Sequence, residues 1–314
     1  MGYKIKYRER KGMFVVEKLI KGFIQYQTEH KKLSNNTIES YRRDILQFHK
    51  YLKDIRISSP SQVTSENVMN YNLFMQRQGK ADSSITRSIS TIKSFFQYLN
   101  MIKYMDNNPA KYVHMVKPVK KLPETLTSKE IELFLEQPKQ EGIKGYRDKA
   151  MLELLYATGI RVTELISLNI NDVNLKMCFI NCLGDGGKER SIPIYPAAVS
   201  ALSKYINEVR DIIAASSDEE ALFLNVKGHR MTRQGFWKIV KFYKEKAKIN
   251  KQITPQTLRH SFALHLLQNG ANLKLIQNML GHADISSTQV YAQLMKNRFT
   301  DVYRQYHPRA RENV

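Results

Sequence analysis

The spacing of apolar residues along the first 115 positions predicts a bundle of helices. Four segments, covering residues 14–29, 36–52, 66–77 and 83–99, repeat an apolar residue every three or four positions, which is the period of one face of a helix. In the last of them, Ile85, Ile89, Ile92 and Phe96 form the apolar face. The pattern predicts that residues 12–116 fold as a helical domain.

A short basic segment then separates this bundle from the rest of the chain. Residues 117–124 hold Pro118 and Pro123, and each proline biases the residue before it away from helical geometry. Helix resumes at Thr127, which is followed at the third position by Glu130 as in a capping box. We therefore expect an extended linker over 117–124 and a second domain over 125–307.

The second domain mixes two periodicities. Residues 177–183 and 190–194 alternate apolar and polar side chains on either side of a Gly-Asp-Gly-Gly turn, which predicts a β-hairpin. Three helices follow near the end: one from Pro255 to the stop at Asn269-Gly270, one over 273–280, and one that begins near 286–288 and carries Tyr291. The predicted fold class is mainly α with a small antiparallel sheet.

Composition narrows the class of partner. The 314 residues carry a formal net charge of +21, and the first 120 hold 22 Lys and Arg against 9 Asp and Glu. Such an excess favours a polyanion, with nucleic acid ahead of an anionic membrane. No run approaches the roughly 18 apolar residues of a membrane span, and the first residues lack a signal peptide's apolar segment. We expect no membrane association and a cytoplasmic, nucleoid-associated protein.

The two cysteines are not expected to form a disulfide or bind a metal ion. If Cys178 and Cys182 lie on one strand, they are about 13 Å apart, too far for a disulfide. We expect two reduced packing residues. No Cys/His cluster has zinc spacing, and no phosphate-binding P-loop occurs.

Three motifs occur in a recognisable order. They are Thr-Gly-Ile-Arg-Val-Thr-Glu-Leu at 158–165, Gly-Lys-Glu-Arg at 187–190, and Leu-Arg-His-Ser-Phe-Ala-Leu-His-Leu-Leu at 258–267 with Leu-Gly-His at 280–282 and Tyr291 nine positions later. Together they resemble the catalytic boxes of the tyrosine recombinase (phage integrase) family, over roughly residues 12 to 307. Within that family the chain is most similar to the Xer-type recombinases.

The resemblance implies a reaction at a DNA phosphodiester. Tyr291 would be the nucleophile and would form a 3′-phosphotyrosine, which conserves the bond energy and needs no cofactor or metal. Arg161 and Arg259 would stabilise the charge on the phosphate, a task that suits planar guanidinium groups. Lys188 would protonate the departing 5′-oxygen, and His282 would hydrogen-bond a non-bridging oxygen or support proton transfer.

Other positions have supporting roles or depart from the family pattern. Glu164 either orients Arg161 or forms an ordinary helical ion pair, and His260 is expected to pack or buttress rather than react. Gln256 occupies the position where the family has a histidine, and glutamine cannot take up a proton. We therefore expect water or His282 to carry the proton of Tyr291.

The resemblance also implies partners and an assembly. The first domain would be a core-binding domain that closes with the second as a clamp round double-stranded DNA. Candidate phosphate contacts are Arg42, Arg43, Arg87, Lys93, Lys117, Lys120 and Lys121. A homo-tetramer, or a hetero-tetramer with a related recombinase, would join two sites through a four-way junction, with an apolar tail beyond residue 297 docking onto a neighbour.

The sequence leaves four hypotheses about the function of the protein. They are Xer-like chromosome dimer resolution, mobile-element integration or excision, DNA binding with weak or no catalysis, and a type IB-like topoisomerase.

Overall fold

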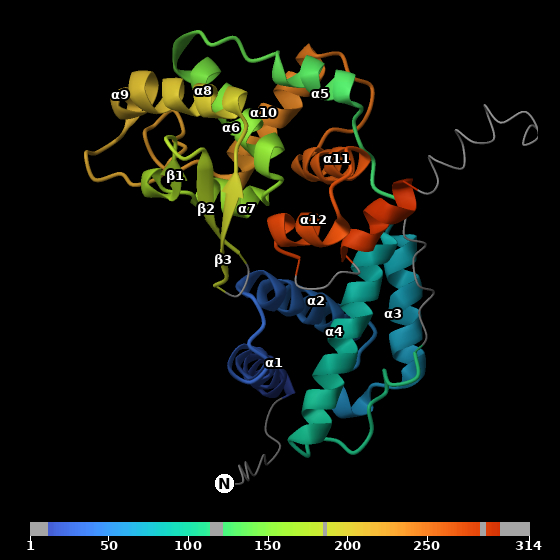
Figure 1. The fold of residues 1–314 in the computed structure, drawn as a ribbon. Coiled ribbons are helices and arrows are strands. Elements are labelled where there is room, and N and C mark those ends of the chain that lie inside the picture. The colour runs from blue at the N-terminus through green and yellow to red at the C-terminus, as the bar shows by residue number, and fades with distance from the viewer. Residues whose placement is uncertain (1–11, 114–121, 185–186, 283–286, 296–314) are drawn as a thin grey trace, which may run out of the picture. The chain divides into compact units, whose positions relative to one another are not determined.

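The computed structural model describes residues 12–113, 122–184, 187–282 and 287–295 (Figure 1). The chain forms two compact units, Met1–Lys120 and Lys121–Val314. The division falls within the predicted linker 117–124, of which residues 117–121 lie outside the described ranges. The described residues are mainly helical and include one small antiparallel sheet, so the predicted fold class is confirmed.

Over residues 12–113, the first unit is built from four long helices. They are α1 (Gly12–Glu29), α2 (Asn35–Asp54), α3 (Ser65–Arg77) and α4 (Asp82–Met101), with a 3₁₀ turn at Pro60–Gln62. Helix α4 contacts each of the other three, because its apolar face is fully buried at Ile89 and Ile92. Ser34 caps the N-terminus of α2, and its hydroxyl oxygen accepts a hydrogen bond from the amide of Thr37.

The second unit contains the sheet and the remaining described helices. Its elements are α5 (Ser128–Leu135), α6 (Gly142–Thr158), α7 (Val162–Ser167), a 3₁₀ turn (Ile170–Asp172), β1 (Val173–Asn174), β2 (Phe179–Leu183), β3 (Glu189–Pro193), α8 (Pro196–Tyr205), a π-helical turn (Ile206–Arg210), α9 (Asp211–Ile213), α10 (Arg233–Lys246), α11 (Pro255–Gln268) and α12 (Leu273–Leu280). Residues 287–295 are also helical.

Helix α6 forms the centre of this unit. It contacts α5, α7, α8, α11 and β3, and most of its residues are buried, including the charged Arg147, Asp148 and Glu153. A helix that is surrounded in this way must end inside the protein, and α6 does so at Gly159, which has a left-handed φ of 59°. A β-carbon at Gly159 would lie 2.3 Å from the ring of Phe262 on α11, so only glycine allows the two helices to approach this closely.

The sheet has the order β1-β2-β3, and both pairs are antiparallel. The predicted strand over 177–183 begins only at Phe179, because Cys178 has a left-handed φ of 55°. Cys178 is exposed and Cys182 is buried, and both thiols are free. The expectation that both cysteines pack in the core is therefore wrong for Cys178.

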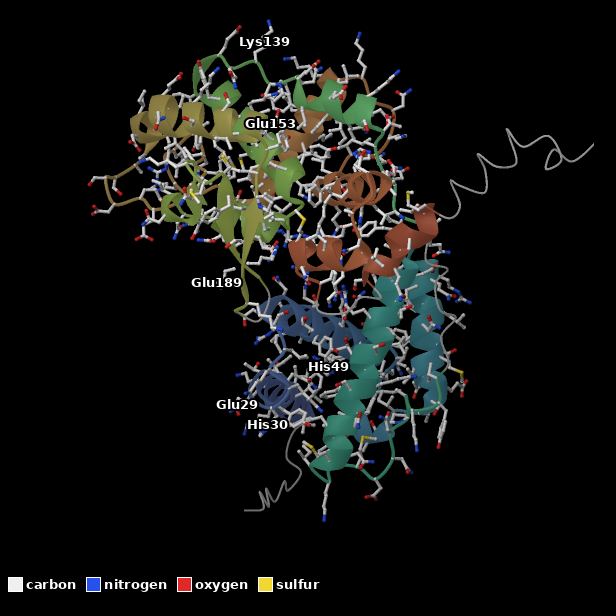
Figure 2. The ribbon with its side chains drawn as sticks, viewed as in Figure 1. Glu29, His30, His49, Lys139, Glu153 and Glu189 are labelled. Carbon is white, nitrogen blue, oxygen red and sulfur yellow. The ribbon has the colours of Figure 1, made fainter. Side chains whose placement is uncertain are left out.

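The side chains of β3 alternate between two environments. Glu189 is exposed (Figure 2), Arg190 is half-buried, Ser191 is exposed and Ile192 is buried. Since successive strand residues point to opposite faces, Arg190 shares the inward face with Ile192. This alternation directs a charged side chain toward the protein interior.

Candidate active site

The C-terminus of α12 gathers three arginines from separate parts of the sequence. Helix α12 ends at Gly281, whose φ is 64°. Nε of Arg190 donates to the carbonyl oxygen of Met279 at 2.9 Å, Nη2 of Arg259 to that of Leu280 at 2.8 Å, and Nη2 of Arg161 to that of Gly281 at 3.4 Å. The last carbonyls of a helix lack partners within it and carry partial negative charge, so cations stabilise them.

Arg259 is the most deeply fixed of the three. It lies on the second turn of α11, is buried, and also donates from Nη1 to the carbonyl of Gly159 at 2.6 Å. It thus joins the C-termini of α6 and α12. Burial, followed by the charge of Arg161, lowers the pKa of Arg259 to about 10, so it remains a cation at neutral pH.

Glu164 holds the other two arginines together. Its carboxylate accepts two hydrogen bonds from Arg190, at 3.0 and 2.9 Å, and two from Arg161, one from the backbone amide at 2.6 Å and one from Nη1 at 3.1 Å. Burial opposes ionisation of Glu164, but these hydrogen bonds and the two positive charges hold its pKa below its ordinary value. Three arginines and one carboxylate leave this cluster with a formal charge of +2.

Arg190 is the residue in this cluster that we did not predict. Its guanidinium lies between Gly184 of the hairpin and Gly281, where a β-carbon would come within 2.9 and 3.0 Å of it. The alternation along 190–194 contained the signal, because it places Arg190 on the same face as the buried Ile192. A charged residue on an inward face requires a buried partner, and Glu164 is that partner.

His282 follows directly after this cluster. Its Nδ1 lies 2.9 Å from Oγ1 of the buried Thr288, which is on the first turn of the helix 287–295. Burial and the nearby arginines, Arg259 first, lower the pKa of His282 to about 4. His282 is therefore neutral at pH 7. If Thr288 donates to Nδ1, the proton is on Nε2, which can donate to an anion.

Tyr291 is buried beside the arginine cluster, and only 1% of its surface is exposed. Its ring packs with Phe262, Ile276 and Leu280, and its Oη lies 2.8 Å from Nδ1 of His260. Burial raises the pKa of Tyr291, while the charge of Arg259 acts in the opposite direction. The contact with His260 was not expected from the sequence.

Two predicted site residues lie apart from these contacts. Gln256, on the first turn of α11, is exposed, and it makes no hydrogen bond to any described residue. Lys188 is exposed on the hairpin, of which residues 185–186 lie outside the described ranges, and its amine likewise contacts no described partner. The structure brings together Arg161, Arg259, Glu164 and His282, and beside them it places His260 in contact with Tyr291.

The candidate DNA contacts in the first unit differ in their surroundings. Arg42 and Arg43 are exposed on α2. Arg87 is 47% exposed but forms two hydrogen bonds of 2.9 Å with the buried carboxylate of Asp44, which raise the pKa of Arg87. Lys93 is half-buried, and Lys117, Lys120 and Lys121 lie outside the described residues.

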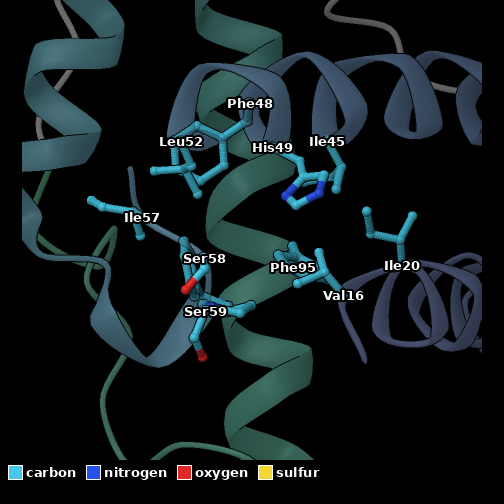
Figure 3. A pocket seen from close by; sticks show the side chains of 12 residues that line it. Val16, Ile20, Ile45, Phe48, His49, Leu52, Ile57, Ser58, Ser59 and Phe95 are labelled. Atoms are coloured by element: carbon cyan, nitrogen blue, oxygen red, sulfur yellow. The ribbon is translucent and has the colours of Figure 1, made fainter. Parts of the chain in front are cut away.

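A small pocket in the first unit offers no alternative site. It is lined mainly by apolar residues of α1, α2 and α4, and His49, Ser58 and Ser59 also line it (Figure 3). Burial lowers the pKa of His49. In the described ranges, no three His, Cys, Asp or Glu side chains are placed to hold a metal ion, and no helix is long and apolar enough to cross a bilayer.

Comparisons with known proteins agree with these motifs. Residues 124–298 match the phage integrase family, and residues 20–101 match the N-terminal SAM-like domain of phage integrases. Tyrosine recombinase XerD of Oceanobacillus iheyensis is 46% identical over 298 residues, which cover 94% of this chain and the whole of that protein.

Solved structures extend the likeness to the fold. The crystal structure of XerA recombinase is 27% identical, with a TM-score of 0.53 over 93% of this chain and 98% of that one. A post-cleavage complex of XerH recombinase with a palindromic difH substrate is 22% identical, with a TM-score of 0.75 over 90% and 94% of the two chains. The chain belongs to the phage integrase family and is a Xer-type tyrosine site-specific recombinase.

Proposed function

We propose that this recombinase cleaves each DNA strand with Tyr291 and rejoins it to a different strand. The phenolic oxygen attacks the phosphorus and forms a 3′-phosphotyrosine, and the P–O5′ bond breaks. The observation that carries the proposal is a buried tyrosine next to a cluster of three arginines held at the end of one helix. Rejoining reverses these steps with the 5′-hydroxyl of another strand.

Each residue has a role that its surroundings support. Arg161 and Arg259 bind the non-bridging oxygens, because their guanidinium groups are already oriented by backbone carbonyls and reorganise little. Neutral His282 donates a hydrogen bond to the same phosphate. Lys188, exposed on its hairpin, protonates the 5′-oxygen. Glu164 and Arg190 are positioning residues that act through Arg161.

The partner is double-stranded DNA, which the two units hold as a clamp. The net charge of +21 supports it, as do the exposed arginines of α2. Arg87 serves mainly to join α2 to α4 through Asp44, and we give it a smaller share of the phosphate contacts than Arg42 and Arg43. The XerH relative was solved on its difH substrate.

We further propose that two sites are joined in a tetramer, identical or mixed with a related recombinase, and that the reaction passes through a four-way junction. The biological role is the resolution of joined chromosomes, in the cytoplasm at the nucleoid. The identity of 46% to a XerD protein supports that role over mobile-element integration. The tail residues that would link protomers lie outside the described ranges.

The first experiment identifies the DNA site by trapping. The protein is mixed with fragmented chromosomal DNA of its source, denatured rapidly in detergent, and the DNA that stays covalently attached is sequenced. We expect one short sequence with two inverted half-sites. Fragments without any shared sequence would contradict site specificity, and no attached DNA at all would favour a binding protein without catalysis.

A second experiment separates a recombinase from a topoisomerase. Linear duplexes with one or two copies of the trapped site are incubated with the protein, and strand exchange is followed by gel electrophoresis. We expect recombinant products only when two sites are present. Relaxation of a supercoiled plasmid that lacks the site, at the same rate as one that carries it, would contradict the proposal.

A further inference from the structure

The side chain of His260 is in direct contact with the reacting atom of the proposed nucleophile. Its Nδ1 lies 2.8 Å from Oη of Tyr291, within the range of about 2.6–3.2 Å over which a proton passes between two groups. His260 lies on α11 and Tyr291 on the helix 287–295. Both elements pack in one apolar cluster, so the contact is fixed by packing on both sides.

The protonation state of His260 suits an acceptor. The titratable and charged groups that act on it or contact it are Arg259 on its own helix, Tyr291 on the next and His282 after α12. Burial and the charge of Arg259 lower the pKa of His260 below its ordinary value of about 6.5. At pH 7 the ring is therefore neutral, and a neutral imidazole has one nitrogen that accepts a proton.

Other described groups are less able to take this proton. Nδ1 of His282 is engaged by Thr288, and the pKa of His282 is about 4. The carboxylate of Glu164 is occupied by Arg161 and Arg190. Gln256 is exposed, lies one turn before His260, and has no basic atom. Among the described residues, His260 alone combines a basic nitrogen with contact to Oη.

We propose that His260 is the general base for cleavage, a statement that rests on Tyr291 being the nucleophile. As Oη approaches the phosphorus, the O–H bond breaks and the proton passes to Nδ1. The Oη–P bond forms, the P–O5′ bond breaks, and the leaving oxygen takes a proton from Lys188. In rejoining, Nδ1 returns its proton to Oη. A lone imidazolium beside Arg259 is unfavourable, so transfer accompanies attack, when negative charge builds on the phosphate.

The test compares single-turnover rates of adduct formation on a nicked duplex carrying the trapped site. His260→Asn keeps a hydrogen-bond acceptor near the position of Nδ1 but cannot take up a proton. We expect this variant to cleave about 10²–10⁴-fold more slowly. The wild-type rate falls as the pH drops through the pKa of His260, which burial and Arg259 hold below its ordinary value, and the variant lacks this dependence.

His265→Asn is the matched control. His265 lies on the same helix, and its Nδ1 is also 2.8 Å from a tyrosine hydroxyl, that of Tyr156. A merely structural loss of a tyrosine–histidine pair would affect both variants alike. We expect the control to keep the wild-type dependence of rate on pH.

A modified substrate distinguishes a base from an acid. Replacing the bridging 5′-oxygen by sulfur gives a leaving group that needs no proton. We expect this substrate to restore the rate of Lys188→Ala but not that of His260→Asn. Restoration of His260→Asn, a wild-type rate for it, or an unchanged pH dependence would each overturn the proposal.

Two further measurements test the role of His260 if the variant does not fold, and separate its failure from a failure of the proposed function. If His260→Asn does not fold, the pKa of His260 is measured by NMR in the wild-type protein, and it must equal the pKa seen in the cleavage rate; unequal values contradict the base. If Tyr291→Phe still forms an adduct, the proposed function fails. If only the His260 results disagree, the proposed function stands and this inference fails.

Discussion

At the scale of single residues, Glu164 holds together two of the three arginines that reach the end of α12. Its carboxylate contacts both Arg161 and Arg190, and those two reach the end of α12. The sequence offered an orienting role or an ordinary ion pair for Glu164. The structure shows a buried carboxylate shared by two arginines, which a pattern of i, i+3 spacing cannot reveal, because Arg190 is 26 positions away.

Glu164→Gln tests this connection. Removing the charge leaves two arginines without their counter-ion, and we expect a loss of about 3–5 kcal/mol in the free energy of unfolding. Glu245→Gln, which removes the carboxylate from an exposed pair with Lys241, should leave stability almost unchanged. Denaturant unfolding of both variants provides the comparison, and equal losses would contradict a central role for Glu164.

The stability lost in Glu164→Gln should depend on pH. Because the folded state lowers the pKa of Glu164, its ionisation stabilises the protein above the unfolded-state pKa of about 4.3. That contribution is lost as the pH falls through the lower folded-state pKa. The stability difference between wild type and Glu164→Gln should therefore be constant near pH 7 and shrink below about pH 4. A difference that is independent of pH would show that the charge is not the cause.

Gln256 provides a second test at this scale. Its side chain is exposed and makes no hydrogen bond to a described residue, so we expect Gln256→Ala to leave thermal stability unchanged. If its amide donates to the bound phosphate, the rate of adduct formation falls about 10- to 100-fold, the effect of one hydrogen bond to a charged group. An equal rate for Ala and Gln would remove this position from catalysis.

At the scale of elements, the helices of the first unit and those near the C-terminus were predicted, whereas α8 and α10 were not. The four helices of the first unit and α12 follow directly from apolar periodicity. The contact between His260 and Tyr291 was not predictable, because it depends on how α11, α12 and the helix 287–295 pack. Strand β1 is two residues long, and the turn at Cys178 adopts a conformation that cysteine rarely takes, so neither has a sequence signal.

The close packing of Arg190 against Gly281 at the end of α12 predicts that a side chain at position 281 destabilises the protein. Gly281→Ala places a β-carbon 3.0 Å from the guanidinium of Arg190 and adds the strain of a left-handed residue. Gly270→Ala adds the strain alone, because its φ is 91° with no atom within 4 Å. We expect a cost of about 1–2 kcal/mol in unfolding free energy for the control and a larger one for Gly281→Ala.

Activity should separate these two variants further. Gly281→Ala displaces Arg190 and with it the carbonyls that orient the other two arginines, so the rate of adduct formation should fall. Gly270→Ala should cleave at the wild-type rate. Equal rates in single-turnover assays would show that the end of α12 does not position the site.

At the scale of the whole molecule, the net positive charge predicts that the affinity for DNA depends steeply on salt concentration. A clamp that neutralises about 6–10 phosphates loses roughly 10³–10⁵-fold in affinity between 50 and 200 mM salt. Replacing Arg42 and Arg43 by Gln should lower the slope of log affinity against log salt by about 2, whereas Lys227→Gln, on an exposed loop of the second unit, should not. Fluorescence anisotropy on the trapped site measures the slopes, and a flat dependence would contradict the clamp.

The central claim is that Tyr291 forms the covalent bond to DNA. The most direct measurement is mass spectrometry of the trapped complex after digestion of both protein and DNA. We predict that a nucleotide 3′-phosphate is attached to the peptide containing Tyr291, and that Tyr291→Phe binds DNA within a few-fold of wild type but yields no attached nucleotide. Attachment to any other residue, or an adduct that persists in Tyr291→Phe, would contradict the account.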